Sequence, residues 1–199
     1  LLIIITHRQP ETVGIFLAAT LLVAIGLVDD RFELDALTKL AGQALAAGIL
    51  LLFGIQVLWL PMNGVITLPP SIGQLVTVLI VLVTINAVNF IDGLDGLAAG
   101  VVGIGTLAFF VYTYLLAQQT SPTNYFSLAG LISAIVLGMC AGFLPHNWRP
   151  AKIFMGDTGS LALGAGFAGI AVLTKQEFAL LFFGLIFVVE ALSVIIQVI

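Results

Sequence analysis

The sequence of 199 residues is 61% hydrophobic and only 8% charged, with a net charge of −4. A soluble domain averages about 45–50% apolar and roughly 25% charged residues, so the composition excludes an ordinary soluble domain. It predicts an all-α fold, a polytopic bundle of transmembrane helices. The six Lys and Arg residues form no basic patch for a nucleic acid, and the single cysteine excludes an intramolecular disulfide.

Apolar segments long enough to cross a bilayer follow one another along the chain. A transmembrane helix needs roughly 17–25 apolar residues. The sequence predicts seven such segments, at 12–28, 40–60, 75–91, 97–117, 126–145, 158–173 and 178–199. Residues 1–5 are interpreted as the tail of an earlier helix. We therefore expect residues 1–199 to be a single integral membrane domain that is truncated at both ends.

The segment 158–173 gives the weakest signal, because it is short and rich in glycine. Within it, the sequence GAGFAG at 164–169 matches the spacing GxGxxG of dinucleotide-binding loops. That fingerprint requires a preceding strand, whereas these residues lie inside an apolar span. The sequence therefore predicts a membrane helix here and no nucleotide site.

The predicted spans sort the connecting loops between two membrane faces. One face receives loops 28–39, 92–96 and 146–160, which carry four of the six basic residues, and the positive-inside tendency assigns it to the cytoplasm. The same face receives seven of the ten acidic residues: Asp29, Asp30, Glu33, Asp35, Asp92, Asp95 and Asp157. Three loops that are far apart in the sequence thus bring carboxylates to one membrane surface.

Carboxylates gathered in this way raise one another's pKa values unless a cation neutralises them. Oxygen ligands alone favour Mg²⁺, which takes one or two carboxylates and completes its shell with water and phosphate oxygens. His7 and His146 fall on opposite faces, which argues against a histidine-based zinc site and against a catalytic triad with Ser160. Basic residues beside the acids suit phosphate oxygens. The pattern therefore indicates phosphoryl transfer between a soluble nucleotide and a lipid.

Each of these residues also has a simpler interpretation on its own. Asp157 could cap a helix that starts near Thr158, and Lys39 and Arg149 could be basic anchors at the membrane interface. The three loops agree on one face, however, and this agreement favours a joint site.

Three motifs in these loops resemble the signatures of the polyprenyl-phosphate N-acetylhexosamine-1-phosphate transferases. They are GLVDDRFELDALTKLAGQ, NAVNFIDGLDGLAAG and HNWRPAKIFMGDTGSLALG, in the order and spacing of that family. The resemblance implies a protein of about ten or eleven membrane helices in the bacterial inner membrane, with a cytoplasmic active site that depends on Mg²⁺ or, as a substitute, Mn²⁺. It implies transfer of a sugar 1-phosphate from a UDP-N-acetylhexosamine donor to a polyprenyl phosphate acceptor, with release of UMP. A homodimer is compatible with it.

The resemblance also implies roles for single residues. Asn89 and Asp157 match positions that hold Mg²⁺ against the diphosphate of the donor. Four further residues match positions around the uridine: Asp95 recognises uracil, Phe154 stacks on it, Gly156 lets the backbone approach, and Asn147 makes a polar contact.

The catalytic set implied by the resemblance is Asp29, Asp30, Lys39 and Asp92. The paired acids Asp29 and Asp30 would position or deprotonate the lipid phosphate, and Lys39 would lie near the phosphates. Asp92 matches an acid of unassigned role, and Asn86 is expected to support the site without binding the metal. We favour direct attack by the lipid phosphate, and the alternative is a covalent phosphosugar intermediate on Asp29 or Asp30.

The motifs also resemble two branches of the family. NFIDGLDGLAAG and GFLPHN are similar to the bacterial GlcNAc-1-phosphate transferases of wall and surface glycan synthesis, which we favour. SLALG, TKQE and VVEALSVIIQVI are more similar to the phospho-N-acetylmuramoyl-pentapeptide transferases of peptidoglycan synthesis. Two other classes are weaker alternatives: a membrane prenyltransferase, from the DDxxxxD pattern in DDRFELD, and a transporter, from Glu190 within the last span.

Overall fold

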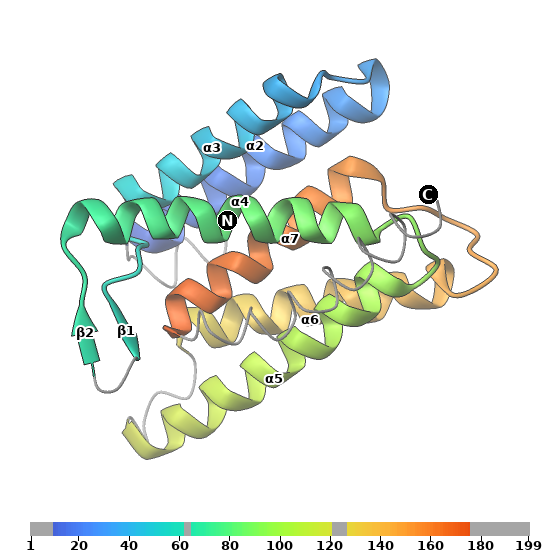
Figure 1. Cartoon of the computed structure of the whole chain (residues 1–199). Helices are drawn as coiled ribbons and strands as arrows, with labels where there is room; N and C mark the ends of the chain where they lie inside the picture. Colours follow the sequence, from blue (N-terminus) through green and yellow to red (C-terminus); the bar gives the residue numbers. More distant parts are fainter. Residues whose placement is uncertain (1–9, 62–64, 121–126, 176–199) are drawn as a thin grey trace, which may run out of the picture.

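The computed structural model describes residues 10–61, 65–120 and 127–175, and these residues form a helical bundle. The helices are α2 (Pro10–Phe32), α3 (Ala36–Leu52), α4 (Pro70–Ile91), α5 (Leu97–Thr120), α6 (Leu128–Asn147) and α7 (Gly156–Thr174) (Figure 1). Within this part of the chain, five helices are long and apolar enough to cross a membrane, and α3 is a shorter apolar helix. The predicted all-α bundle is thus confirmed. Residues 1–5 and the predicted span 178–199, with Glu190, lie outside the described residues.

The prediction of a helix over 40–60 is wrong at both ends. Helix α3 begins at Ala36 because the carboxylate of Asp35 accepts a hydrogen bond from the backbone N–H of Thr38 at 3.1 Å. The bond from the Thr38 hydroxyl, together with this backbone bond, holds the pKa of Asp35 below its ordinary value. The helix ends at Leu52, and Gly54 follows at φ +82°, a left-handed conformation that ends helices.

The chain after α3 forms an antiparallel hairpin that the sequence did not predict. Strand β1 (Trp59–Pro61) pairs with β2 (Val65–Thr67), and Trp59 lies opposite Thr67. Strands of three residues are too short to show the alternation by which strands are recognised in a sequence.

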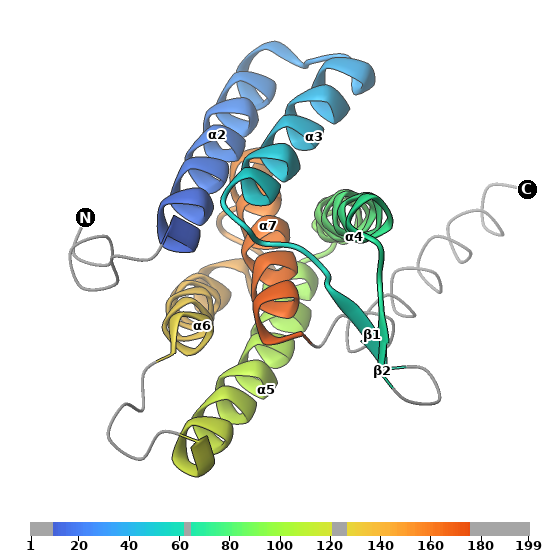
Figure 2. The same cartoon turned by 90° about the vertical axis from the view of Figure 1, so that its left-hand side faces the viewer.

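Helix α7 lies at the centre of the bundle, although its sequence gave the weakest membrane signal. It contacts α2, α4, α5 and α6, and Figure 2 shows these helices around it. In its most apolar stretch 61% of the residues are buried, against 28–33% for the other four long helices. A helix that faces protein instead of lipid can carry small residues. At Gly164 a Cβ atom would lie 2.7 Å from the Cα atom of Ile85, so this glycine permits close packing of α7 on α4.

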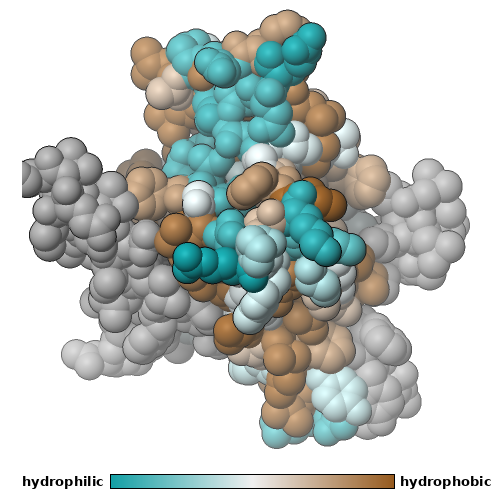
Figure 3. All heavy atoms as spheres, turned by 90° about the vertical axis from the view of Figure 1, so that its right-hand side faces the viewer, coloured by the Kyte–Doolittle hydropathy of each residue, from teal (hydrophilic) through white to brown (hydrophobic). Residues whose placement is uncertain are grey.

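The connections α2–α3, α4–α5 and α6–α7 all lie at one end of the bundle, as the sequence predicts, and the hairpin lies at the opposite end (Figure 1). Seen from the end where these three connections meet, polar residues gather over the α2–α3 connection and the middle of the face, with apolar residues around them (Figure 3). The fold therefore places the predicted functional loops together on one polar surface.

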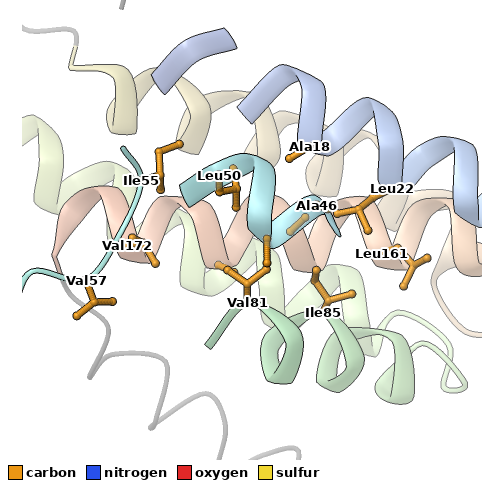
Figure 4. Packing of buried hydrophobic residues seen from close by; sticks show 13 residues of the cluster. Ala18, Leu22, Ala46, Leu50, Ile55, Val57, Val81, Ile85, Leu161 and Val172 are labelled. Atoms are coloured by element: carbon orange, nitrogen blue, oxygen red, sulfur yellow. The ribbon is translucent and has the colours of Figure 1, made fainter. Parts of the chain in front are cut away.

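The largest apolar cluster joins α2, α3, α4 and α7 beneath this surface. Figure 4 shows residues from all four helices pointing toward one another. Its members include Ala18, Leu22, Ala46, Leu50, Val81, Ile85, Leu161 and Val172. A second cluster joins α4, α5, α6 and α7, where the rings of Phe109 and Phe167 meet edge to face at 5.7 Å. These contacts fix the first turn of α7 between the ends of α2 and α4.

Candidate active site

A lysine lies between two carboxylates at the polar end of the bundle. The Nζ atom of Lys39, in the first turn of α3, lies 2.5 Å from Oδ2 of Asp29, near the end of α2. The same Nζ atom donates a hydrogen bond to Oδ2 of Asp157, in the first turn of α7. The side chain of Asp29 is 8% exposed and those of Lys39 and Asp157 are 22% and 23% exposed. The ion pairs are therefore partly shielded from solvent.

Asn89, in the last turn of α4, completes this arrangement. Its Nδ2 atom donates to Oδ1 of Asp157 and to Oγ of Ser160, each at 2.8 Å. We call Asp29, Lys39, Asn89 and Asp157 the lysine–carboxylate cluster. The four residues come from four helices, and the structure brings them together as the sequence predicted.

The two neighbouring acids of the DD pair point in different directions. Asp29 accepts a hydrogen bond from the backbone N–H of Leu34 at 2.8 Å through Oδ1 and pairs with Lys39 through Oδ2. Asp30 makes no ion pair with Lys39 among the contacts of the described residues. Its carboxylate instead accepts hydrogen bonds from the backbone N–H groups of Asp157 and Thr158, at 2.7 and 3.1 Å.

Asp92 caps the carboxyl end of α4 beside these groups. Burial raises the pKa of Asp92 to about 6, and the negative charges of Asp157 and Asp30 act in the same direction. The group therefore titrates near neutral pH, where a nearby cation would favour its ionised form.

Replacing Asp92 by asparagine is expected to raise the melting temperature of the metal-free protein at pH 7.5. The folded state binds the proton of Asp92 more tightly than the unfolded state does. The stability that this proton contributes is therefore fully present below the ordinary pKa of 3.8 and is lost as the pH rises from there through about 6. Asparagine removes that loss. Melting curves in detergent with EDTA should show a larger advantage of the variant at pH 7.5 than at pH 4.5, where only part of the loss has occurred. An equal shift at both pH values would contradict the assignment.

The residues predicted to bind uridine lie in two loops that one buried side chain joins. Asn147, only 3% exposed, accepts a hydrogen bond from the backbone N–H of Gly96 and donates one to the carbonyl of Ile153, both at 2.9 Å. Gly96 follows Asp95, and Ile153 precedes Phe154. The carboxylate of Asp95 also accepts a bond from the backbone N–H of Ala151 at 3.1 Å. The structure thus brings these loops together, while the contact of each residue with uridine stays a prediction.

Replacing Asn147 by alanine is expected to lower the stability of the protein by about 2 kcal/mol, because a net contribution of about 1 kcal/mol is typical for each of two lost hydrogen bonds. Aspartate keeps the acceptor for Gly96 but turns a buried carboxylate oxygen toward the carbonyl oxygen of Ile153, so Asn147→Asp should show a larger loss than Asn147→Ala at neutral pH. Thermal unfolding of both variants in detergent tests the order. Equal melting temperatures for the alanine variant and the unmodified protein would contradict it.

Three polar residues that support the site, Gln43, Thr158 and Ser160, were not predicted from the sequence, whereas Asn86 was expected to support it. Gln43 and Asn86 exchange hydrogen bonds at 2.6 and 3.3 Å, one helical turn below Lys39 and Asn89, and Gln43 is fully buried. Ser160 binds Asn89, and Thr158 binds Asp30. The spacings of four residues between Lys39 and Gln43, and of three between Asp157 and Ser160, are the signal that could have indicated them.

The donor atoms near Asp157 suit a hard divalent cation. No group of three or more His, Cys, Asp or Glu side chains within the described residues has the geometry of a complete metal site. Mg²⁺ does not require one, since it binds one or two carboxylates and keeps water or phosphate oxygens. Asp157 offers two carboxylate oxygens and Asn89 an amide oxygen, although in the structure Nδ2 of Asn89 faces Oδ1 of Asp157, so binding a cation through the Asn89 oxygen requires the amide to turn over. Burial, together with the negative charges of Asp157 and Asp30, raises the pKa of the neighbouring Asp92. These residues therefore fit Mg²⁺.

Comparison with known proteins identifies the family of the chain. Residues 12–175 match the sequence profile of glycosyl transferase family 4. The decaprenyl-phosphate N-acetylglucosaminephosphotransferase of Mycolicibacterium smegmatis is 40% identical over 155 residues, which cover 76% of this chain and 38% of that protein. The phospho-N-acetylmuramoyl-pentapeptide-transferase of Shouchella clausii is 40% identical over 209 residues, which cover 98% of this chain and 62% of that protein. That of Desulforudis audaxviator is 43% identical over 196 residues, with coverages of 88% and 56%.

The chain thus spans from about two fifths to three fifths of the length of these relatives. The match confirms the resemblance that the three motifs indicated, and the apolar helices agree with a multi-pass membrane protein. With its profile match extending from the first turn of α2 to the end of α7, the chain belongs to glycosyl transferase family 4.

Proposed function

We propose that the protein transfers N-acetylglucosamine 1-phosphate from UDP-GlcNAc to undecaprenyl phosphate or a related polyprenyl phosphate, releasing UMP, in a reaction that depends on Mg²⁺. The observation that carries this proposal is the position of Lys39 between Asp29 and Asp157, beside Asn89, at the polar end of a membrane bundle. A phosphate carried on a lipid reaches the protein at the membrane surface, where this cluster lies. The relatives named for transfer to decaprenyl phosphate support the same chemistry.

Asp157 and Asn89 would hold Mg²⁺, which would neutralise negative charge on the donor diphosphate. Lys39 would bind phosphate oxygens and stabilise the charge that develops on them during transfer. Asp29 orients Lys39 through its contact with Nζ. An oxygen of the lipid phosphate attacks the phosphorus bonded to the sugar, a new P–O bond forms, and the bond to UMP breaks, so that UMP leaves with the bridging oxygen.

The direct route suits the surroundings of the paired acids better than a covalent intermediate does. Both oxygens of Asp29 already accept from Leu34 and Lys39, and both oxygens of Asp30 accept from the first turn of α7. A carboxylate held in this way is a weaker nucleophile than a free one. The polyprenyl phosphate is already anionic near neutral pH and needs no strong base.

The uridine would lie against the joined loops 92–96 and 148–155. Phe154 is 70% exposed, so its ring can stack on a base, and Asp95 in the neighbouring loop carries the acceptor for uracil. Gly156, at φ +65°, gives the backbone a turn that other residues rarely adopt. The base would then lie beside the amino end of α7, where Asp157 would meet the diphosphate.

A second donor deserves a direct test because of one observation. The match to the Shouchella clausii transferase covers 98% of this chain, whereas the match to the Mycolicibacterium smegmatis protein covers 76%. The alternative function is therefore transfer of phospho-N-acetylmuramoyl-pentapeptide, the first membrane step of peptidoglycan synthesis.

The deciding experiment is UMP release by the intact protein in detergent, with Mg²⁺ and undecaprenyl phosphate. One reaction receives UDP-GlcNAc and the other UDP-N-acetylmuramoyl-pentapeptide, and controls omit the lipid or replace Mg²⁺ with EDTA. We expect release that needs the lipid and Mg²⁺, with UDP-GlcNAc as donor. Release with the pentapeptide donor alone would establish the alternative. No lipid-dependent release with either donor would overturn the proposal.

The same surface is proposed to face the cytoplasm at the inner membrane, since both donors are soluble cytoplasmic nucleotides. The positive-inside tendency of Arg31, Lys39, Arg149 and Lys152 supports this orientation. A cysteine introduced at the exposed Phe32 would react with an impermeant maleimide only after the membrane is opened, and labelling of intact cells would contradict the orientation.

A further inference from the structure

We propose that Asp30 acts as a positioning residue and not as a catalytic base or nucleophile: it caps the amino end of α7 and thereby holds Asp157 in place. The inference rests on the proposed function for its kinetic readout, and on contacts within the chain for its structural one. It separates the roles of two adjacent acids that the sequence motif presents as a pair.

The hydrogen bonds of the first turn of α7 carry the argument. Oδ1 of Asp30 accepts from the backbone N–H of Asp157 at 2.7 Å, and Oδ2 accepts from the backbone N–H of Thr158 at 3.1 Å and from its hydroxyl at 2.5 Å. The first N–H groups of a helix have no partner inside the helix. Met155, which precedes α7, makes no side-chain cap bond. Asp30 supplies from α2 the acceptor that the local sequence of α7 lacks.

Two glycines permit this approach. A Cβ atom on Gly156 would lie 2.9 and 3.0 Å from the two carboxylate oxygens of Asp30, closer than real Cβ atoms pack. Gly26 lies one turn before Asp30 on the same face of α2, and a Cβ atom there would lie 2.4 Å from the Cα atom of Thr158. At Gly26 and at Gly156 no side chain separates α2 from α7. The absence of these side chains lets the carboxylate of Asp30 reach the first turn of α7.

The consequence for chemistry follows from where the oxygens point. A carboxylate has about four acceptor positions, and three of those of Asp30 are taken by α7. The positive end of the α7 dipole further stabilises the ionised carboxylate and so makes it a weaker base. Asp29 differs, because it contacts Lys39. Since Asp30 binds the N–H of Asp157 itself, a shift of Asp30 would move Asp157 away from Lys39 and Asn89.

The kinetic test compares Asp30→Asn with Asp30→Ala by UMP release. Asparagine keeps one oxygen for the N–H of Asp157, and its amide nitrogen can donate to the Thr158 hydroxyl, although it no longer accepts from the Thr158 N–H. Asparagine also caps helices about as well as aspartate. We expect Asp30→Asn to lose about tenfold or less and Asp30→Ala about a hundredfold or more, the loss typical of a small misplacement of catalytic groups. A base or nucleophile would be lost equally in both variants, so an asparagine variant as inactive as the alanine variant overturns the proposal.

Variants on the other side of the contact give a matched pair. Thr158→Ser keeps the hydroxyl that donates to Asp30, whereas Thr158→Val keeps the shape and removes it. Activity close to normal for serine and clearly lower for valine is expected. The valine change should add little to Asp30→Ala, because both remove one interaction. Fully multiplied losses in the double variant would contradict a shared role.

A structural readout separates failure of this inference from failure of the proposed function. Hydrogen exchange of the peptide containing residues 156–160, measured in detergent without substrates, should be faster in Asp30→Ala than in Asp30→Asn and the unmodified protein. Asp35→Ala, which removes the cap of α3, is the control and should leave this peptide unchanged. Unchanged exchange in Asp30→Ala and in Thr158→Val overturns the inference. If the unmodified protein releases no UMP, the proposed function fails, while the exchange result still decides this one.

Discussion

Replacing Asp157 by asparagine is expected to lower UMP release by about a hundred- to a thousandfold, the range typical for loss of one preorganised electrostatic contact in a transition state. Asp157 contacts Lys39 through Oδ2 and Asn89 through Oδ1. Asparagine removes the negative charge that would bind Mg²⁺ and leaves Lys39 paired with Asp29 alone. Because the backbone N–H that Asp30 caps is unchanged, the first turn of α7 should still fold.

The measurement is the turnover number as a function of Mg²⁺ concentration. The variant should need more Mg²⁺ for half-maximal activity and should stay slow at saturation. Asp35→Asn is the matched control: it removes a negative charge from the same end of the bundle but lies outside the cluster, and asparagine also caps helices. Near-normal turnover of Asp157→Asn at low Mg²⁺ would refute the assignment of Asp157 as a metal ligand.

The main features of the fold could be predicted because a bilayer imposes strong limits on a chain. Only helices satisfy their own backbone hydrogen bonds in lipid, so apolar runs of sufficient length predict spans, and their order assigns the loops to faces. Helix α7 shows where this logic weakens. This helix is surrounded by protein and can therefore contain many glycines, which lower its hydropathy. The sequence pattern does not reveal which helix is central.

The site could be predicted as a set of residues but not as a set of contacts. Asp29, Lys39, Asn89 and Asp157 were identified, and the structure brings them together. The different roles of Asp29 and Asp30 could not be predicted from the sequence. They depend on hydrogen bonds that Asp30 accepts from Asp157 and Thr158, which are 127 and 128 positions further along the chain. The bond between Gln43 and Asn86 was missed for the same reason: either amide alone inside an apolar run has no visible partner.

Replacing Lys39 by methionine is expected to destabilise the metal-free protein by about 2–3 kcal/mol. Removal of one partner from a fully buried ion pair costs about 3–5 kcal/mol, and the partial exposure of this cluster reduces that range. The ammonium group lies between the carboxylates of Asp29 and Asp157, and methionine fills similar space without neutralising either. The apparent melting temperature in detergent with EDTA measures the effect, and Lys39→Arg should lose less because it keeps the positive charge.

A double variant tests whether charge is the cause. In Lys39→Met with Asp157→Asn, one of the two uncompensated carboxylates is gone, so part of the lost stability should return although the protein carries two changes. Mg²⁺ should also raise the melting temperature of Lys39→Met more than that of the unmodified protein, because a cation can then approach both carboxylates. If Lys39→Met melts at the normal temperature, the pairs contribute as little as exposed salt bridges do, and Lys39 is held in place for phosphate binding alone. If it melts lower and neither the second change nor Mg²⁺ restores it, uncompensated negative charge is not the cause of the lost stability. Recovery by both routes would show that Lys39 serves as the cation of the site until metal and phosphate arrive.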